Sequence, residues 1–125
     1  MRSVTVIIGY PGSVISCNHY LGRRSDGGSY VKAEARAFQI ELGWALKTSH
    51  IEEWTMPISV TCSGKFKDKA STPDLSNLSK CILDAIEELT GINDRNYRWH
   101  DGAIVWKKDE EPELLIYIEE ACNGS

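Results

Sequence analysis

The sequence lacks the cysteine and histidine spacings that mark a zinc site or a disulfide framework. Its four cysteines, Cys17, Cys62, Cys81 and Cys122, lie far apart without a C-x-x-C pair, and its three histidines form no H-x-x-x-H pattern. Zinc is therefore not indicated. We expect reduced cysteines, with Cys62 and Cys81 acting as small apolar core residues.

Long apolar runs and a secretory leader are also missing. No stretch approaches the roughly 18 apolar residues of a membrane span. The N-terminus has no basic region followed by an apolar stretch and a small-residue cleavage site. We therefore expect a soluble, intracellular protein without a membrane partner.

Positive charge is scarce overall: the chain has 14 Lys and Arg but 18 Asp and Glu, which gives a formal net charge of -4. This charge argues against a polyanionic partner, since phosphate binding draws its affinity from Lys and Arg. However, residues 109–125 contain six acids and no Lys or Arg, so residues 1–108 carry a formal charge of +2. A local basic surface and simply solvated charges are both open interpretations.

The sequence does contain the hydrophobic pattern of one small α+β domain that spans residues 1–125. Four segments have strand-like alternation or β-branched runs, and two have apolar residues at helical spacing. The order β-α-β-α-β-β predicts a mixed sheet of about four strands with two helices packed on it. The predicted strands are 3–8, 57–66, 98–106 and 114–119, and the predicted helices are 31–49 and 74–89.

Residues 10–30 show no regular period. A loop or irregular hairpin of this length in a compact domain suggests a functional segment. In the helix that follows, one apolar stripe contains Ala35, Phe38, Leu42, Ala45 and Leu46. The tryptophans are expected in packing rather than in base stacking: Trp44 and Trp54 in the core or an interface, Trp99 and Trp106 in the sheet or a dimer contact.

Asp74 follows a proline at the start of the second predicted helix, in the stretch TPDLSNLSK. One interpretation is a helix N-cap, whose carboxylate accepts a hydrogen bond from the backbone N–H of Ser76 or Asn77. The other interpretation is a metal ligand that the helix holds in place. Lys80 and Asp84 also fit an ordinary i, i+4 surface pair.

A second acid-bearing loop, with Asp94 in GINDRN, follows the same helix. Asp94 and Asp74 could approach each other only if the chain folds one loop toward the other or if a second subunit supplies one of them. Two converging carboxylates with room for water are what Mg²⁺ requires. A nearby lysine would stabilise the extra charge of a phosphate under attack.

The segment PDLSNLSKCILDAI, residues 73–86, resembles a motif of the RusA family of Holliday junction resolvases, P-D-x-D-N-L-x-K followed by an aspartate four residues later. GINDRN is similar to the family's downstream acidic turn, and YPGSVISCNHY, residues 10–20, is similar to its proline, serine and asparagine loop. The order and spacing match from about residue 4 to residue 119. These small endonucleases are often encoded by phages and prophages, so the resemblance implies the cytoplasm of a bacterial or phage-infected cell.

The resemblance also implies a RusA-like fold, a homodimer and an enzyme that resolves branched DNA. Carried over by position, Asp74 and Asp94 are metal ligands for Mg²⁺, or for Mn²⁺ in its place, and both are catalytic together with Lys80. Ser76, Asn77 and Asp84 shape the site. Paired symmetric nicks across a four-way junction, in DNA recombination and repair, suit a two-fold dimer with two equivalent sites.

The chain departs from the family pattern at two positions. Ser76 stands where a second acid is usual, and a neutral hydroxyl is a poorer Mg²⁺ ligand than a carboxylate. Asn93 stands where an aspartate usually precedes the acid matched by Asp94. Three functions follow as alternatives: a junction-resolving endonuclease, a junction-binding dimer with weakened or lost cleavage, and a small interaction domain in which Asp74 is only a cap.

Several polar residues outside these motifs are candidates for DNA contacts or, alternatively, for solvated surface. The long loop carries Asn18, Arg23 and Arg24, and the two arginines could grip phosphates. Three lysines alternate near the end of the second predicted strand, which suits either a DNA-facing edge or a protected sheet edge. These are Lys65, Lys67 and Lys69.

Overall fold

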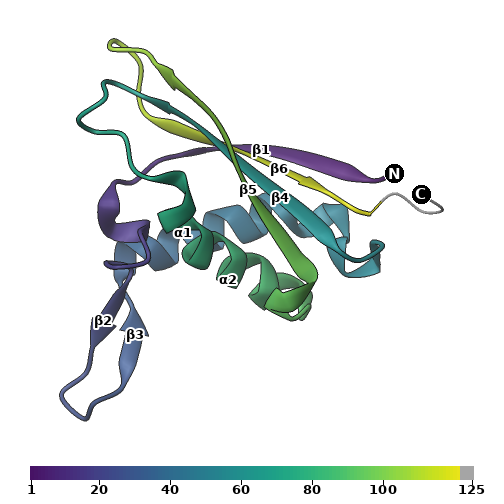
Figure 1. Cartoon of the computed structure of the whole chain (residues 1–125). Helices are drawn as coiled ribbons and strands as arrows, with labels where there is room; N and C mark the ends of the chain where they lie inside the picture. The colour runs from purple at the N-terminus through teal and green to yellow at the C-terminus, as the bar shows by residue number, and fades with distance from the viewer. Residues whose placement is uncertain (122–125) are drawn as a thin grey trace.

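The computed structural model describes residues 1–121, so Cys122 lies outside the described residues. Four strands form the main sheet, two helices pack on it, and a separate two-stranded hairpin projects from the body (Figure 1). The sheet strands are β1 (Ser3–Gly9), β4 (Ile58–Phe66), β5 (Tyr97–Trp106) and β6 (Glu113–Glu119). The helices are α1 (Ala33–Leu46) and α2 (Ser79–Thr90), and the hairpin strands are β2 (Leu21–Arg23) and β3 (Ser29–Val31).

The main sheet is mixed and has the strand order β1-β6-β4-β5. Strand β6 is antiparallel to both β1 and β4, whereas β4 and β5 are parallel and α2 lies in the connection between them. The prediction of a small α+β domain with a mixed four-stranded sheet and two helices is therefore confirmed. A parallel pair requires such a crossover, which carries the chain from the end of β4 back to the start of β5.

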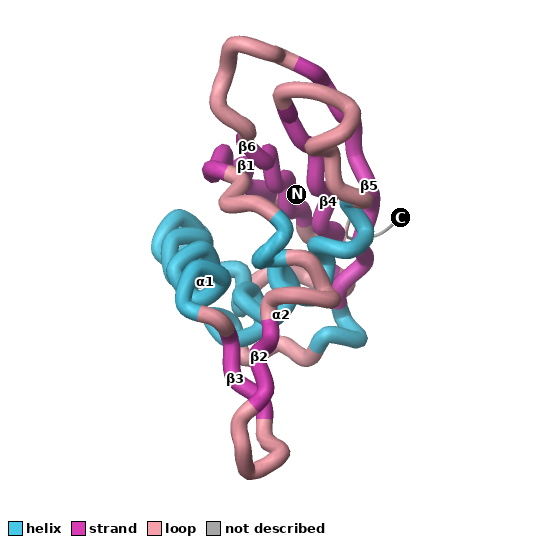
Figure 2. The backbone as a smooth tube through the Cα atoms, turned by 90° about the vertical axis from the view of Figure 1, so that its left-hand side faces the viewer, coloured by secondary structure: helices cyan, strands magenta, loops and turns pink. Residues whose placement is uncertain are grey.

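Both helices lie against the same face of the sheet (Figure 2). The buried face of β4 carries Ile58, Val60 and Cys62, as its alternating pattern predicts. Cys62 and Cys81 are fully buried free thiols, which confirms their prediction as core residues. Burial raises the pKa of both thiols to about 12, so both are protonated at neutral pH.

Helix α1 is shorter than predicted and ends in a 3-10 turn, η2 (Lys47–Ser49). The prediction for Ala45 is wrong, because Ala45 is exposed; a buried Gln39 packs toward α2 and donates to the backbone oxygen of Cys81 at 3.0 Å. Trp54 is buried in the core, whereas Trp44 is 68% exposed and leaves only its interface interpretation open. The rest of the predicted stripe is buried: Ala35, Phe38, Leu42 and Leu46.

The second predicted helix consists of two parts. A 3-10 turn, η4 (Leu75–Leu78), leads into α2, and the helix ends at Gly91, whose φ of 75° is the left-handed C-terminal geometry that glycine allows. The hairpin that the sequence allows within the irregular segment extends from Leu21 to Val31, with β2 and β3 antiparallel. No helix within residues 1–121 is long and apolar enough to cross a membrane.

Candidate functional site

Asp74 is the N-cap of η4, which confirms the capping interpretation for a 3-10 turn rather than for an α-helix. Its Oδ1 atom accepts the backbone N–H of Ser76 at 3.2 Å and the Ser76 hydroxyl at 2.8 Å. The Asp74 side chain is exposed, and within residues 1–121 its Oδ2 atom accepts no hydrogen bond. One carboxylate oxygen is therefore committed to the turn while the other faces solvent.

Asn77 connects this turn to the irregular segment that follows β1. Its backbone oxygen accepts the N–H of Cys17 at 2.6 Å, and its Oδ1 atom lies 3.7 Å from the Cys17 sulfur. Asn18, the next residue, is exposed beside this junction. The segment thus brings its own polar residues to the start of the second helix, 60 positions away in the chain.

Asp84 has a second partner in addition to the predicted one. Lys80 Nζ lies 3.7 Å from Asp84 Oδ2, as expected of an i, i+4 pair. The hydroxyl of Tyr20 donates to the same oxygen at 2.5 Å. Tyr20 is 1% exposed, and burial together with this hydrogen bond raises its pKa above the ordinary value. Sequence reasoning missed Tyr20, because no spacing rule relates it to Asp84.

Asp94 lies far from Asp74 in the same chain. It begins a 3-10 turn, η5 (Asp94–Asn96), which lies between α2 and β5, whereas Asp74 precedes α2 (Figure 1). The 12 residues of α2 span about 18 Å. Because β4 and β5 are parallel, the two acids lie at opposite ends of this strand pair.

Asp74 and Asp94 of one chain therefore do not form a Mg²⁺ site with two carboxylates. Residues 1–121 contain no group of three or more His, Cys, Asp or Glu side chains that could hold a metal ion. Asn93, at the second departure from the family motif, has a structural role, since its side chain accepts the backbone N–H of Arg95 at 3.1 Å. The metal site that the resemblance implies is incomplete without a further ligand.

The arginines of the long loop lie on the projecting hairpin. Arg23 ends β2 and Arg24 begins the tight turn, where its backbone N–H donates to Gly28 at 2.7 Å. Both side chains are exposed, and neither makes an ion pair within residues 1–121. The β2–β3 hairpin that carries them projects from the body of the domain (Figure 2).

The three lysines have different surroundings. Lys65 contacts Glu110 at 3.0 Å and Glu113 at 2.8 Å, and these carboxylates raise its pKa. Lys67 lies 3.7 Å from Glu111. The placement of Lys65 at a sheet edge is wrong, because β4 is paired on both sides, with β5 and β6. The third lysine, Lys69, is exposed in the loop after β4.

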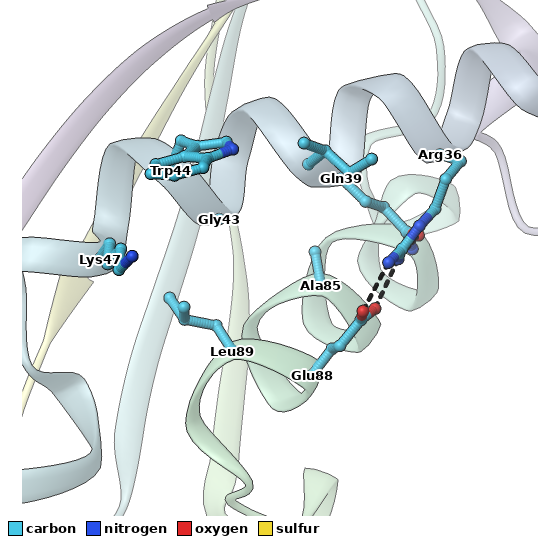
Figure 3. Close-up of a pocket in the computed structure, with 9 residues that line it drawn as sticks. Arg36, Gln39, Gly43, Trp44, Lys47, Ala85, Glu88 and Leu89 are labelled. Carbon is cyan, nitrogen blue, oxygen red and sulfur yellow. Dashed lines mark hydrogen bonds and ion pairs between the residues drawn. The ribbon is translucent and has the colours of Figure 1, made fainter.

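A pocket of about 310 Å³ lies between α1 and α2, away from Asp74 (Figure 3). Arg36 closes one end through two hydrogen bonds to Glu88, both of 2.5 Å. Trp44 lines the other end, with Lys47 Nζ 4.7 Å from the centre of its ring. None of the residues predicted to bind DNA or metal lines this pocket.

Comparison with known proteins adds no assignment: no family model matches the chain, and no curated protein matches it significantly.

Proposed function

We propose that the protein is a Mg²⁺-dependent, structure-selective endonuclease of the RusA type. In this proposal a homodimer resolves four-way DNA junctions by paired symmetric nicks. The basis is the sequence motif of residues 73–86, together with the downstream acid and the loop of residues 10–20. The function is thus inferred from those motifs. The contact between the loop of residues 10–20 and the helical motif supports it.

The observation that carries the proposal is the meeting of two motifs at one exposed surface. The loop of residues 10–20 docks on the helical motif through the hydrogen bond from Cys17 to Asn77 and through the bond from Tyr20 to Asp84. These contacts join two segments that the resemblance had linked only by their order in the sequence. Asp74, Lys80 and Asn18 are exposed at or beside them.

The proposed roles follow from charge and exposure. Asp74 offers a carboxylate oxygen to solvent, and Lys80 presents an ammonium group that can neutralise the charge developing on a phosphodiester. Mg²⁺, when bound, would supply a water activated for attack on phosphorus. Because one chain does not bring Asp94 to Asp74, this proposal depends on the homodimer. Arg23 and Arg24 add phosphate contacts that carry no base specificity.

A junction-binding dimer without cleavage is the second candidate, and Ser76 favours it. The Ser76 hydroxyl donates a hydrogen bond to Asp74 Oδ1 at 2.8 Å. A neutral donor therefore stands where the family motif has a second carboxylate. A site with fewer carboxylates binds Mg²⁺ more weakly. DNA binding through the hairpin does not depend on that metal.

A nicking assay separates the two candidates. The substrates are an end-labelled four-way junction and a linear duplex of the same sequence, each with Mg²⁺ or with EDTA. The proteins are wild type, Asp94→Asn and the matched control Asp109→Asn, which alters an exposed acid in the turn between β5 and β6. We expect symmetric nicks on the junction only, lost with EDTA and with Asp94→Asn and retained with Asp109→Asn.

Other outcomes contradict this proposal in different ways. Junction binding in a gel-shift assay without any nicking supports the binding dimer instead. An absence of preference for the junction over the duplex removes both candidates and leaves an interaction domain in which Asp74 caps a turn.

A further inference from the structure

Helix α1 carries apolar side chains outside the stripe that packs into the core. Ile40 is 47% exposed, and Trp44, one turn later, is 68% exposed. Within residues 1–121 they are the only large hydrophobic side chains of the two helices that are exposed. A helix on the surface of a domain normally turns polar residues outward. The packing of this chain therefore does not account for these two side chains.

Both side chains line the pocket of about 310 Å³ between α1 and α2, which we call the α1–α2 groove. From α2 the groove is lined by Leu89 and by the small side chain of Ala85 (Figure 3). Ligand pockets typically enclose roughly 300–1,000 Å³. The α1–α2 groove lies at the lower end of this range, so it suits one large apolar side chain with its flanking backbone rather than a whole helix.

Gly43 leaves space in the groove that the chain itself does not fill. A Cβ atom at this position would have no heavy atom of a neighbouring segment within 4 Å. Its φ is not among the positive glycine angles, so its backbone conformation does not require glycine either. Apart from proline, glycine is the least favourable residue inside a helix. A glycine that the fold does not require, in the lining of a pocket, allows another molecule to approach closely.

The charge of the groove is concentrated on one lysine. Lys47 Nζ lies 4.7 Å from the centre of the Trp44 ring, and within residues 1–121 it makes no ion pair. At the other end Arg36 is held by two hydrogen bonds to Glu88, so these two charges offset each other (Figure 3). A ligand that carries a carboxylate beside an apolar group is therefore complementary to the groove.

We propose that the α1–α2 groove binds a short acidic peptide segment of a partner protein. A large apolar side chain of that segment lies over Gly43, between Trp44 and Leu89, and a nearby carboxylate pairs with Lys47. Residues four apart on a helix lie about 5–6 Å from each other, and an extended peptide advances about 3.3 Å per residue. The acid is therefore one or two residues from the apolar side chain. This inference goes beyond the proposed function and does not depend on it.

The composition of the groove favours a peptide over a nucleic acid. Nucleic-acid binding draws its affinity from several phosphate contacts by Lys and Arg. This groove offers one cation without a carboxylate partner, and Glu88 adds a negative charge to its lining. A pocket with apolar walls and an exposed tryptophan is instead typical of sites that hold an anchor side chain of a protein partner.

Labelled peptides test the proposal directly. Each probe is a fluorescein-labelled peptide with a central Phe, Leu or Trp, aspartates on both sides and Ser-Gly ends. Control peptides have Ala at the centre or asparagines in place of the aspartates. Fluorescence anisotropy measures the affinity, and the indole N–H resonance of Trp44 in the ¹⁵N-labelled protein, assigned with Trp44→Phe, reports the place of binding. We expect saturable binding with a Kd below about 1 mM, a shifted Trp44 resonance and about tenfold weaker binding of both controls.

Two variants of Gly43 separate a binding role from a structural one. Gly43→Leu fills the groove without meeting other segments of the chain, so we expect an intact fold and peptide affinity reduced about tenfold or more. Gly43→Ala should raise the Tm by a few degrees, because alanine favours the helix. It should also weaken peptide binding by a smaller factor than Gly43→Leu. Circular dichroism measures the fold and the Tm.

Matched pairs of variants locate the contact. Ile40→Ala and Lys47→Glu should each weaken peptide binding several-fold, because they remove an apolar wall and reverse the charge that pairs with the acid. Ile7→Ala and Lys107→Glu make the same changes at exposed positions outside the groove and should leave the affinity unchanged.

Three other results would overturn the proposal. The first is that none of the probe peptides binds saturably, or that Gly43→Leu binds them as wild type does. The second is a larger shift of the Trp44 resonance with a single-stranded oligonucleotide than with the peptides, which would assign the groove to nucleic acid. The third is a Trp44 resonance that moves with protein concentration alone, which would show that a second copy of the chain covers the groove.

Discussion

At the scale of single residues, Ser76 occupies one of the two carboxylate oxygens of Asp74. Its hydroxyl and its backbone N–H both donate to Asp74 Oδ1, so Asp74 serves as a cap and has one oxygen left for a ligand. Helix and turn caps hold carboxylates in a defined direction. The cap and the proposed ligand are thus compatible roles of one side chain, and Ser76 limits only the second role.

Ser76→Asp is expected to tighten Mg²⁺ or Mn²⁺ binding by about tenfold, because a second carboxylate joins Asp74 and oxygen anions are the preferred ligands. Titration calorimetry measures the affinity, and Ser76→Asn provides a neutral control of equal size. An affinity unchanged between the Asp and Asn variants would place Ser76 outside the metal site.

At the scale of elements, the segment before α1 and helix α2 are joined by a polar contact at the margin of the core. The Tyr20 ring is buried among apolar residues while its hydroxyl reaches Asp84, which also pairs with Lys80. Hydrogen bonds to charged groups are stronger than those between neutral groups. This contact fixes the loop against the helix that carries the motif and orients Asp84 beside Lys80.

Tyr20→Phe is expected to lower the free energy of unfolding by about 1–2 kcal/mol, because it removes a hydrogen bond to a charged group. Tyr97→Phe is the matched control, since the hydroxyl of this buried tyrosine lies 2.9 Å from the neutral hydroxyl of Thr90. Urea unfolding measures both effects. In a double-mutant cycle, additivity of Tyr20→Phe and Asp84→Asn would show that the two side chains do not interact.

At the scale of the whole molecule, Glu120 ties together three distant parts of the chain. Its carboxylate accepts hydrogen bonds from the Arg2 side chain at 3.0 Å and from the backbone N–H of Thr55 at 2.9 Å. These partners belong to the N-terminus and to the connection before β4. The Arg2 hydrogen bond and the Thr55 N–H lower the pKa of Glu120 to about 2, from an ordinary value of 4.5.

The stabilisation from Glu120 should be complete above pH 4.5 and should disappear as the pH falls from 4.5 toward 2, because the folded protein holds the carboxylate ionised. Glu120→Gln is expected to lower stability at pH 7 and to flatten the acid dependence across that window. Urea unfolding at a series of pH values measures this, with Glu111→Gln as an exposed control. Parallel pH curves for wild type and Glu120→Gln would contradict the assigned role.

The sequence by itself was enough to predict the elements and several local features. Strand alternation in β4, the Asp74 cap and the Gly91 terminus all appear as predicted, because they depend on residues within a few positions of one another. The order of elements likewise predicted the α+β class. The 3-10 character of η4 and the exposure of Ala45 were missed, since local spacing does not determine which neighbour a turn packs against.

Only the tertiary structure decided which distant residues meet. The parallel pairing of β4 with β5 separates Asp74 from Asp94. The position of β4 inside the sheet brings Lys65 to Glu110 in the turn before β6 and to Glu113 at the start of β6. Tyr20 reaches Asp84 only because its loop docks on α2. Such contacts depend on strand order and on packing between segments far apart in the chain, which hydrophobic periodicity does not encode.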